Sequence, residues 1–238
     1  MGPDLADNRA MTVKVAAFDV YNTLVRWPDD RVTSLDIQRL LDRYGIPTSY
    51  QAIEAARQAV FSLDAPKRAI HGYVDFLALQ FDRMGLRISL DLIESIAAMQ
   101  ESRNDMVLFP DALDAVQAAR SAGKVTCAFT TLPRFMLGRA GDEVIPLLDH
   151  YFDNSTVGLP KGDPRFYKRI TKTLGVEAAS ILCVGDDPIC DCALPAEAGW
   201  QPILLDRTGN LAEQEAGQRA TIGSLSQIER FLIKASDP

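Results

Sequence analysis

Short, uninterrupted apolar runs recur along the chain and are separated by helical patterns. The runs are Val125 to Phe129, Ile181 to Val184 and Ile203 to Leu205, with Val13 to Phe18 as an earlier member. Runs this short and continuous are typical of strands buried on both faces of a parallel sheet. Because strands and helices alternate, the sequence predicts an α/β fold with a parallel sheet at its core.

One helical pattern carries clear signals at both ends. Asp111 stands at its N-cap, Asp114 occupies the capping-box position, and Gly123 follows its last turn. A short polar N-cap and a C-terminal glycine are common helix boundaries. We therefore expect a helix between Asp111 and Gly123, directly before the strand that begins at Val125.

The region from about Arg26 to Asp105 shows helical periodicity without a convincing buried strand. Its apolar residues recur at helical spacing, and breaks at Gly45-Ile46-Pro47, Ala65-Pro66 and Gly85 divide it into about four helices. Such helices pack as a small bundle on their apolar faces. The predicted organisation is a flexible leader (1–12), an α/β core (13–25 and 106–238) and a helical insertion (26–105).

Composition and charge narrow the class of partner. The 238 residues are 47% apolar, which is enough for an ordinary globular core. The net charge is −7 and there is no Lys/Arg cluster, which argues against nucleic acid as a partner. No uncharged stretch exceeds about ten residues, whereas a membrane-spanning helix needs about 20. We expect a protein that acts on a small-molecule substrate away from membranes.

The N-terminus and the cysteines bear on localisation. Met1 to Thr12 has charged residues and no apolar segment, so it does not resemble a secretory signal. The four cysteines are too few for a disulfide scaffold, and two lie inside apolar runs. The four cysteines are Cys127, Cys183, Cys190 and Cys192. A cytoplasmic localisation is the simplest expectation.

Asp19 directly follows the first apolar run, so its carboxylate is predicted at the end of a strand. Open parallel sheets bind ligands at the carboxyl ends of their strands. A carboxylate there can act as a nucleophile and form a covalent intermediate, which splits one difficult step into two easier ones. An isolated aspartate at such a place more often caps a turn, so the assignment depends on the other polar clusters.

A cluster of three acids follows the run Ile181 to Val184, namely Asp186, Asp187 and Asp191. Carboxylates this close repel one another unless a cation is bound. Mg²⁺ takes hard oxygen ligands and keeps several waters, so two or three carboxylates suffice. With Pro188 at a helix N1 position, Asp186 or Asp187 is equally well explained as the cap of the next helix.

Lys161 lies in a loop between a strand-like segment (Tyr151 to Thr156) and a helix that begins near Asp163-Pro164. A carboxylate that attacks an anionic phosphoryl group needs a fixed positive charge nearby, which a lysine and a metal would supply. Thr130 and Thr131 end the strand that begins at Val125 and are suited to donate hydrogen bonds to phosphate oxygens. Taken singly, a loop lysine is usually solvated and a strand-end threonine is unremarkable.

In this order the segments resemble the haloacid dehalogenase (HAD) superfamily of aspartyl-nucleophile hydrolases. The resemblance extends from Val13 to about Gly209 and is carried by Asp19-x-Tyr21-x-Thr23-Leu24, the strand ending in Thr130, Lys161-x-Asp163-Pro164, and Gly185-Asp186-Asp187-x-x-x-Asp191. It implies a Rossmann-like core. Because the helical insertion falls between the first two motifs, it also implies a helical cap that closes over small substrates.

The resemblance further implies roles for single residues. Asp19 would be the nucleophile, Lys161 would balance charge between nucleophile and substrate, and Thr130 with Thr131 would contact the phosphate. The implied ligands of Mg²⁺ are Asp19, the backbone carbonyl of Tyr21, Asp186, and Asp187 or Asp191.

Tyr21 departs from the phosphatase pattern, which has there an aspartate that protonates the leaving group and then activates water. A tyrosine is a poor general base at neutral pH. Thr131 departs as well, in place of a common asparagine. The dehalogenase branch is similar to this chain at Tyr21, but it usually has a glycine in place of Asn22 and lacks the acidic fourth motif. Arg57 is the candidate for an arginine that would grip a haloacid carboxylate.

We expect a HAD-like hydrolase, and first a Mg²⁺-dependent phosphatase of a small phosphorylated metabolite, slow because Tyr21 replaces the usual acid/base. Three clustered carboxylates repel one another and would be costly to keep without a function, whereas one tyrosine beside a nucleophile costs little. The acid cluster therefore weighs more than Tyr21 in this choice. The alternatives are a 2-haloacid dehalogenase-like hydrolase and a low-activity binding or regulatory member of the fold.

Overall fold

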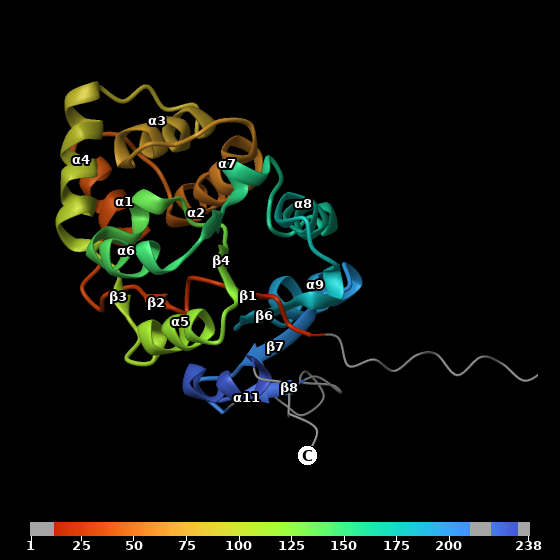
Figure 1. The fold of residues 1–238 in the computed structure, drawn as a ribbon. Helices are drawn as coiled ribbons and strands as arrows, with labels where there is room; N and C mark the ends of the chain where they lie inside the picture. Colours follow the sequence, from red (N-terminus) through yellow and green to blue (C-terminus); the bar gives the residue numbers. More distant parts are fainter. Residues whose placement is uncertain (1–11, 210–219, 233–238) are drawn as a thin grey trace, which may run out of the picture.

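A parallel sheet forms the centre of the protein in this computed structural model, which describes residues 12–209 and 220–232. Within those residues, six strands make up the sheet (Figure 1). Their order is β5 (His150–Phe152), β4 (Val125–Phe129), β1 (Val15–Phe18), β6 (Ile181–Gly185), β7 (Gln201–Leu205) and β8 (Ala220–Ile222). Every neighbouring pair is parallel, so the predicted α/β fold is confirmed.

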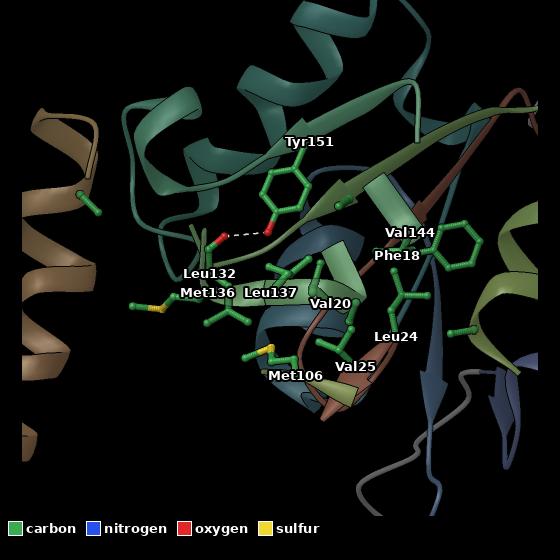
Figure 2. Packing of buried hydrophobic residues seen from close by; sticks show 14 of the residues in the cluster. Phe18, Val20, Leu24, Val25, Met106, Leu132, Met136, Leu137, Val144 and Tyr151 are labelled. Atoms are coloured by element: carbon green, nitrogen blue, oxygen red, sulfur yellow. Dashed lines mark hydrogen bonds between the residues drawn. The ribbon is translucent and has the colours of Figure 1, made fainter. Parts of the chain in front are cut away.

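Side chains of β1 alternate between the two faces of the sheet. Ala16 and Phe18 belong to a large apolar cluster that includes α5 (Ala112–Ser121) and α6 (Gly138–Val144), and Figure 2 shows Phe18 among its neighbours there. Val15 and Ala17 belong to a second cluster on the other face, with α8 (Pro164–Leu174). This alternation follows from the two-residue period of a strand. Shorter helices are α7 (Asn154–Val157), α9 (Leu194–Glu197) and α11 (Glu229–Leu232).

The helical insertion leaves and rejoins the core through an antiparallel ribbon of β2 (Val25–Arg26) and β3 (Val107–Leu108). Between them, in a stretch described without gaps, lie α1 (Ser34–Arg43), α2 (Tyr50–Ala59), α3 (Tyr73–Arg83) and α4 (Leu90–Arg103). We call this insertion the cap. Its buried apolar faces belong to the same large cluster as Ala16 and Phe18, so cap and sheet share one apolar interior.

The predicted breaks within the cap take two forms. Gly45 and Gly85 have φ of 70° and 69°, the left-handed conformation that ends helices without steric cost in a glycine. At Ala65-Pro66 the chain does not simply turn. Helix α2 continues as a π-helical turn (Val60–Asp64) and then a 3₁₀ turn (Ala65–Lys67).

Two local predictions need correction. Asp111 is at the N-cap of α5, but its side chain makes no capping bond and instead accepts hydrogen bonds from Arg207, Ser224 and Leu225. The strand-like segment Tyr151 to Thr156 is part strand and part helix. Strand β5 ends at Phe152, because the Asp153 and Thr156 side chains form a capping box that starts α7.

Residues 1–11 of the predicted leader lie outside the described residues. In the parts of the chain that the structure describes, no helix is long and apolar enough to cross a membrane.

Candidate active site

Asp19 lies at the C-terminal end of the central strand β1, between the ends of β4 and β6. Its backbone N–H donates to the Val184 carbonyl at 2.9 Å, which continues the pairing with β6. The residue is 5% exposed. The chain then turns sharply through Asn22, the one non-glycine residue with positive φ (60°) among the described residues. The sheet topology thus holds the Asp19 carboxylate at the strand-end position where parallel sheets bind ligands.

Lys161 extends from the loop before α8 to the Asp19 carboxylate. Its ammonium contacts Asp19 Oδ1, lies 2.6 Å from Asp191 Oδ1 and is 4.5 Å from the centre of the Phe129 ring. Lys161 is 5% exposed, and its backbone carbonyl accepts a hydrogen bond from the Tyr167 hydroxyl at 2.8 Å. One buried ammonium therefore pairs with two buried carboxylates.

Burial and mutual repulsion shift the proton affinities of these groups. Burial raises the pKa of Asp19 to about 8, and the neighbouring Asp191 adds to this while the Lys161 ammonium opposes it. Burial also raises the pKa of Asp186 to about 6, again with a contribution from Asp191. Burial alone would lower the pKa of Lys161, but Asp19 and Asp191 outweigh it, so this pKa lies above its usual range. The site is short of positive charge.

Three carboxylates converge at this edge of the sheet. One oxygen each from Asp19, Asp186 and Asp191 lies within 4.8 Å of the others. Gly185 permits this approach, because a Cβ there would stand 2.6 Å from the Asp191 Cβ. The Asn22 amide donates to Asp186 Oδ2 at 3.2 Å. Such a set of hard oxygen donors suits Mg²⁺, which is bound through few carboxylates and several waters.

Asp187 is not part of the acid cluster. Its side chain is exposed, and its Oδ1 accepts hydrogen bonds from the backbone N–H groups of Ile189 and Cys190 at 2.7 and 2.8 Å. It therefore caps the π-helical turn Pro188–Ala193, as one reading of the sequence proposed. Asp191 lies within that turn and points inward, accepting from the Asp187 N–H at 2.9 Å. Of the two sequence candidates, only Asp191 is placed to complete a metal site.

A cavity of about 470 Å³ lies between this edge of the sheet and the cap. The core contributes Tyr21, Thr131 and Leu132 to its wall. The Tyr21 ring packs at 53° against Trp27, with 6.3 Å between ring centres. The Leu132 carbonyl is fixed by the Tyr151 hydroxyl at 2.8 Å (Figure 2). Residues of the cap that line the cavity include Arg31, Glu54, Arg57, Phe61, Tyr73, Phe76 and Gln100.

The remaining sequence candidates lie at or near this cavity. Thr130 follows β4, is 1% exposed, and its hydroxyl accepts from the Leu132 N–H at 3.2 Å. Thr131 is exposed to the cavity. Arg57 also lines the cavity, but Glu54 holds its guanidinium through bonds of 2.7 and 3.1 Å. An anionic substrate group would therefore compete with Glu54 for Arg57.

Sequence reasoning missed two residues that support the site. Asn154 bonds to the Lys161 backbone N–H, and Arg207 donates to the Thr23 carbonyl and to Asp111. The Arg207 guanidinium lies 3.9 Å from the centre of the Phe109 ring. The capping-box spacing of Asp153 and Thr156 could have shown a helix start at Asn154, whereas nothing local in the sequence marks Arg207.

Comparison with known proteins agrees with this geometry. The chain is 32% identical over 128 residues to an enolase-phosphatase E1 of Nocardia farcinica, a match that covers 51% of this chain and 53% of that protein. The chain thus spans about half the length of the curated relatives it matches. Residues 13–199 match the family described as haloacid dehalogenase-like hydrolase.

Solved structures share the fold over nearly the whole chain. A 2-haloacid dehalogenase from Pseudomonas syringae pv. Tomato superposes with a TM-score of 0.66 at 18% identity, covering 93% of this chain and 98% of that one. The HAD-hydrolase YfnB from Bacillus subtilis, solved with bound magnesium, gives 0.58 at 16% identity, covering 93% and 99%. With the family match over residues 13–199, the sheet and the cap make the assignment plain: this chain belongs to the haloacid dehalogenase-like hydrolases.

Proposed function

We propose that this hydrolase is a Mg²⁺-dependent phosphatase of a small phosphorylated metabolite. The observation that carries the proposal is the convergence of Asp19, Asp186 and Asp191 within 4.8 Å, beside a single buried ammonium. Asp19, Asp186, Asp191 and the Tyr21 carbonyl would hold the ion. When bound, Mg²⁺ supplies positive charge that stabilises the phosphoryl oxygens in the transition state.

In the proposed reaction, Asp19 attacks the phosphorus. A carboxylate oxygen forms the new bond to phosphorus, the bond from phosphorus to the ester oxygen breaks, and the departing oxygen takes a proton from solvent water to leave as the alcohol. Lys161 holds the attacking carboxylate in place and offsets the negative charge of the phosphoryl group. Thr130 and Thr131 lie at the end of the neighbouring strand, where they would orient the phosphoryl oxygens.

The second half of the proposed reaction is hydrolysis of the aspartyl phosphate by water. By the family resemblance, the acid/base residue of a phosphatase would stand at the position of Tyr21, which lines the cavity. Because a tyrosine is a poor base at neutral pH, the attacking water lacks its usual activator. Slow release of phosphate from the covalent intermediate is therefore part of the proposal.

Two of the comparisons support the phosphatase assignment. The Nocardia farcinica relative is named an enolase-phosphatase, and the Bacillus subtilis structure contains magnesium. These descriptions belong to those proteins. For this chain they add weight to the acid cluster and leave the identity of the phosphoester to experiment.

A second candidate function is 2-haloacid dehalogenation, and Tyr21 is the observation that favours it. A halide leaves without needing a proton, so an aspartate at this position is dispensable. Arg57 also lines the cavity, where it could meet a substrate carboxylate after exchange with Glu54. Asp19 would still be the nucleophile, but such a reaction needs no metal and leaves the carboxylates of Asp186 and Asp191 without a ligand role, which is why the phosphatase stands first.

The test pairs substrates with variants. Phosphate release from a panel of small phosphoesters is measured with and without Mg²⁺ for the wild type and for Tyr21→Asp. We expect slow Mg²⁺-dependent release that rises in the variant. Absence of metal-dependent release in both proteins would sink the phosphatase proposal. Halide release from 2-chloropropionate without metal would support the dehalogenase.

Asp186 and Asp187 provide a matched pair of controls. Asp186→Asn removes a carboxylate from the cluster and should abolish Mg²⁺-dependent turnover. Asp187→Asn changes the adjacent residue, which caps the following turn and lies outside the cluster. It should keep turnover within about threefold, because an asparagine caps a helix nearly as well. Equal losses in both variants would contradict the assigned ligands.

A further inference from the structure

Asn154 connects the core to the cap at the point where each contributes to the active site. It is the first residue of α7 and is 2% exposed. Figure 1 shows α7 beside the end of α2, and α7 packs against the 3₁₀ turn Ala65–Lys67 of the cap. Such burial makes it costly to leave either end of its amide unpaired.

Both ends of the Asn154 amide are used. Its Oδ1 accepts from the backbone N–H of Lys161 at 2.9 Å, and its Nδ2 donates to the backbone carbonyl of Phe61 at 2.9 Å. The two partners are an N–H and a C=O, so the orientation of the amide is fixed by what it binds. One side chain therefore bonds to the loop of the lysine and to the cap simultaneously.

The Phe61 carbonyl is open to this bond because of the π-helical turn. In that turn the Ala65 N–H donates to Val60, five residues back, and not to Phe61. The corresponding partner of Phe61 would be residue 66, which is a proline and has no N–H. The sequence thus leaves a cap carbonyl without a partner in its own turn, and Asn154 supplies the missing donor.

Each end of this link leads to a functional group. Beyond the Lys161 N–H is the ammonium that contacts Asp19, and beyond the Phe61 carbonyl is an aromatic ring that lines the cavity. We propose that Asn154 is a positioning residue that couples the seating of the cap to the placement of Lys161. The kinetic part of this inference rests on the proposed phosphatase activity, whereas the structural part does not.

Two substitutions separate the two bonds. Asn154→Asp keeps an acceptor for Lys161 but removes the donor to Phe61, and Asn154→Ala removes both. Asp153→Asn is the matched control, because it makes the reverse change one residue earlier and retains the acceptor that caps α7. Pro66→Ala is an independent perturbation from the cap side. It introduces a backbone N–H at residue 66 that can bond to the Phe61 carbonyl within the same turn and compete with Asn154.

Hydrogen exchange of the metal-free proteins measures the coupling without reference to activity. In both Asn154 variants, the backbone amides of residues 61–68, among which Pro66 has none, should exchange about three- to tenfold faster, the size expected for one buried hydrogen bond. The Lys161 amide should exchange faster in Asn154→Ala alone. Asp153→Asn should match the wild type at both places. Unchanged exchange of residues 61–68 in Asn154→Asp would overturn the proposal.

Kinetics on the best phosphoester then separate positioning from simple stability. Asn154→Asp should raise KM about three- to tenfold with kcat nearly retained, because the cap is loosened while Lys161 keeps its acceptor. Asn154→Ala should lower kcat as well. A fall in active fraction with unchanged KM and kcat in both variants would contradict positioning. If Asn154→Ala does not fold, Pro66→Ala decides. Faster exchange of the Lys161 amide, which bonds to Asn154, supports the coupling in that variant, and unchanged exchange refutes it. Absence of turnover by the wild type would refute the phosphatase and leave the exchange result to decide this inference.

Discussion

Gly185→Ala tests whether the close approach of Asp191 to the end of β6 holds the site together. A Cβ at residue 185 would stand 2.6 Å from the Asp191 Cβ and closer still to its carboxylate, well inside van der Waals contact. The carboxylate must therefore move. It would then give up its ion pair with Lys161 at 2.6 Å and the hydrogen bond from the Asp187 N–H at 2.9 Å.

The size of the effect follows from these losses. Overpacking of an interior costs about 1–3 kcal/mol, and removing one partner from a buried ion pair costs about 3–5 kcal/mol. Lys161 keeps Asp19 as a partner, so the second cost is only partly incurred, and we expect a total of about 3 kcal/mol. For a protein of this size that corresponds to a fall in melting temperature of about 6–12 °C.

The assay is thermal unfolding followed by circular dichroism, with and without Mg²⁺. Gly162→Ala is the control, because a Cβ at residue 162, next to Lys161, meets nothing within 4 Å. It should leave the melting temperature unchanged or slightly raised. Addition of Mg²⁺ should stabilise the wild type and the control more than Gly185→Ala. A melting temperature of Gly185→Ala within about 2 °C of the control would refute the reasoning.

Three further predictions concern charged pairs. Lys161→Met removes the ammonium shared by two buried carboxylates and should lower the free energy of unfolding by about 3–5 kcal/mol in urea denaturation, with part recovered on adding Mg²⁺; an unchanged midpoint would contradict this. Arg207→Met breaks the bidentate pair with Asp111 and should cost about 1.5–3 kcal/mol in the same assay, while a loss below about 0.5 kcal/mol would show the pair to be incidental. In the cap, the hydrogen bond from Arg83 lowers the pKa of Asp64, so the stability from this pair is present above the ordinary carboxyl pKa of about 4 and is lost as pH falls through the lowered value. The difference in melting temperature between wild type and Arg83→Met should accordingly shrink on acidification from pH 7 to below about pH 4, and a constant difference would argue against the pair.

The sheet and the position of its strand-end residues could be predicted because both depend on local pattern and on a general rule of topology. The run Val125 to Phe129 forms β4 with the predicted bounds, since buried parallel strands are continuously apolar. Asp19 and Asp186 are brought together because parallel strands end at the same edge. The sequence left open whether Asp187 or Asp191 joins them, since that depends on the π-helical turn, which periodicity does not reveal.

Contacts between distant segments lay beyond sequence reasoning. Asn154 bonds to a carbonyl 93 residues earlier in the chain, and nothing near either residue indicates the other. At Asp111 a local signal exists, but contacts with distant residues override it. Its local context predicts a cap, but Arg207 and Ser224, far along the chain, bind its carboxylate instead. In both cases tertiary partners outweigh a local preference.

The shared apolar interior of cap and sheet has a consequence for substrate access. Because the buried faces of α1 to α4 and of β1 belong to one cluster, separating them exposes apolar surface at about 25 cal/mol per Å². Any movement of the cap away from the sheet to admit a substrate should therefore require work against the hydrophobic effect. The same continuity couples the unfolding of the two parts, so that the cap should melt with the sheet in one cooperative transition.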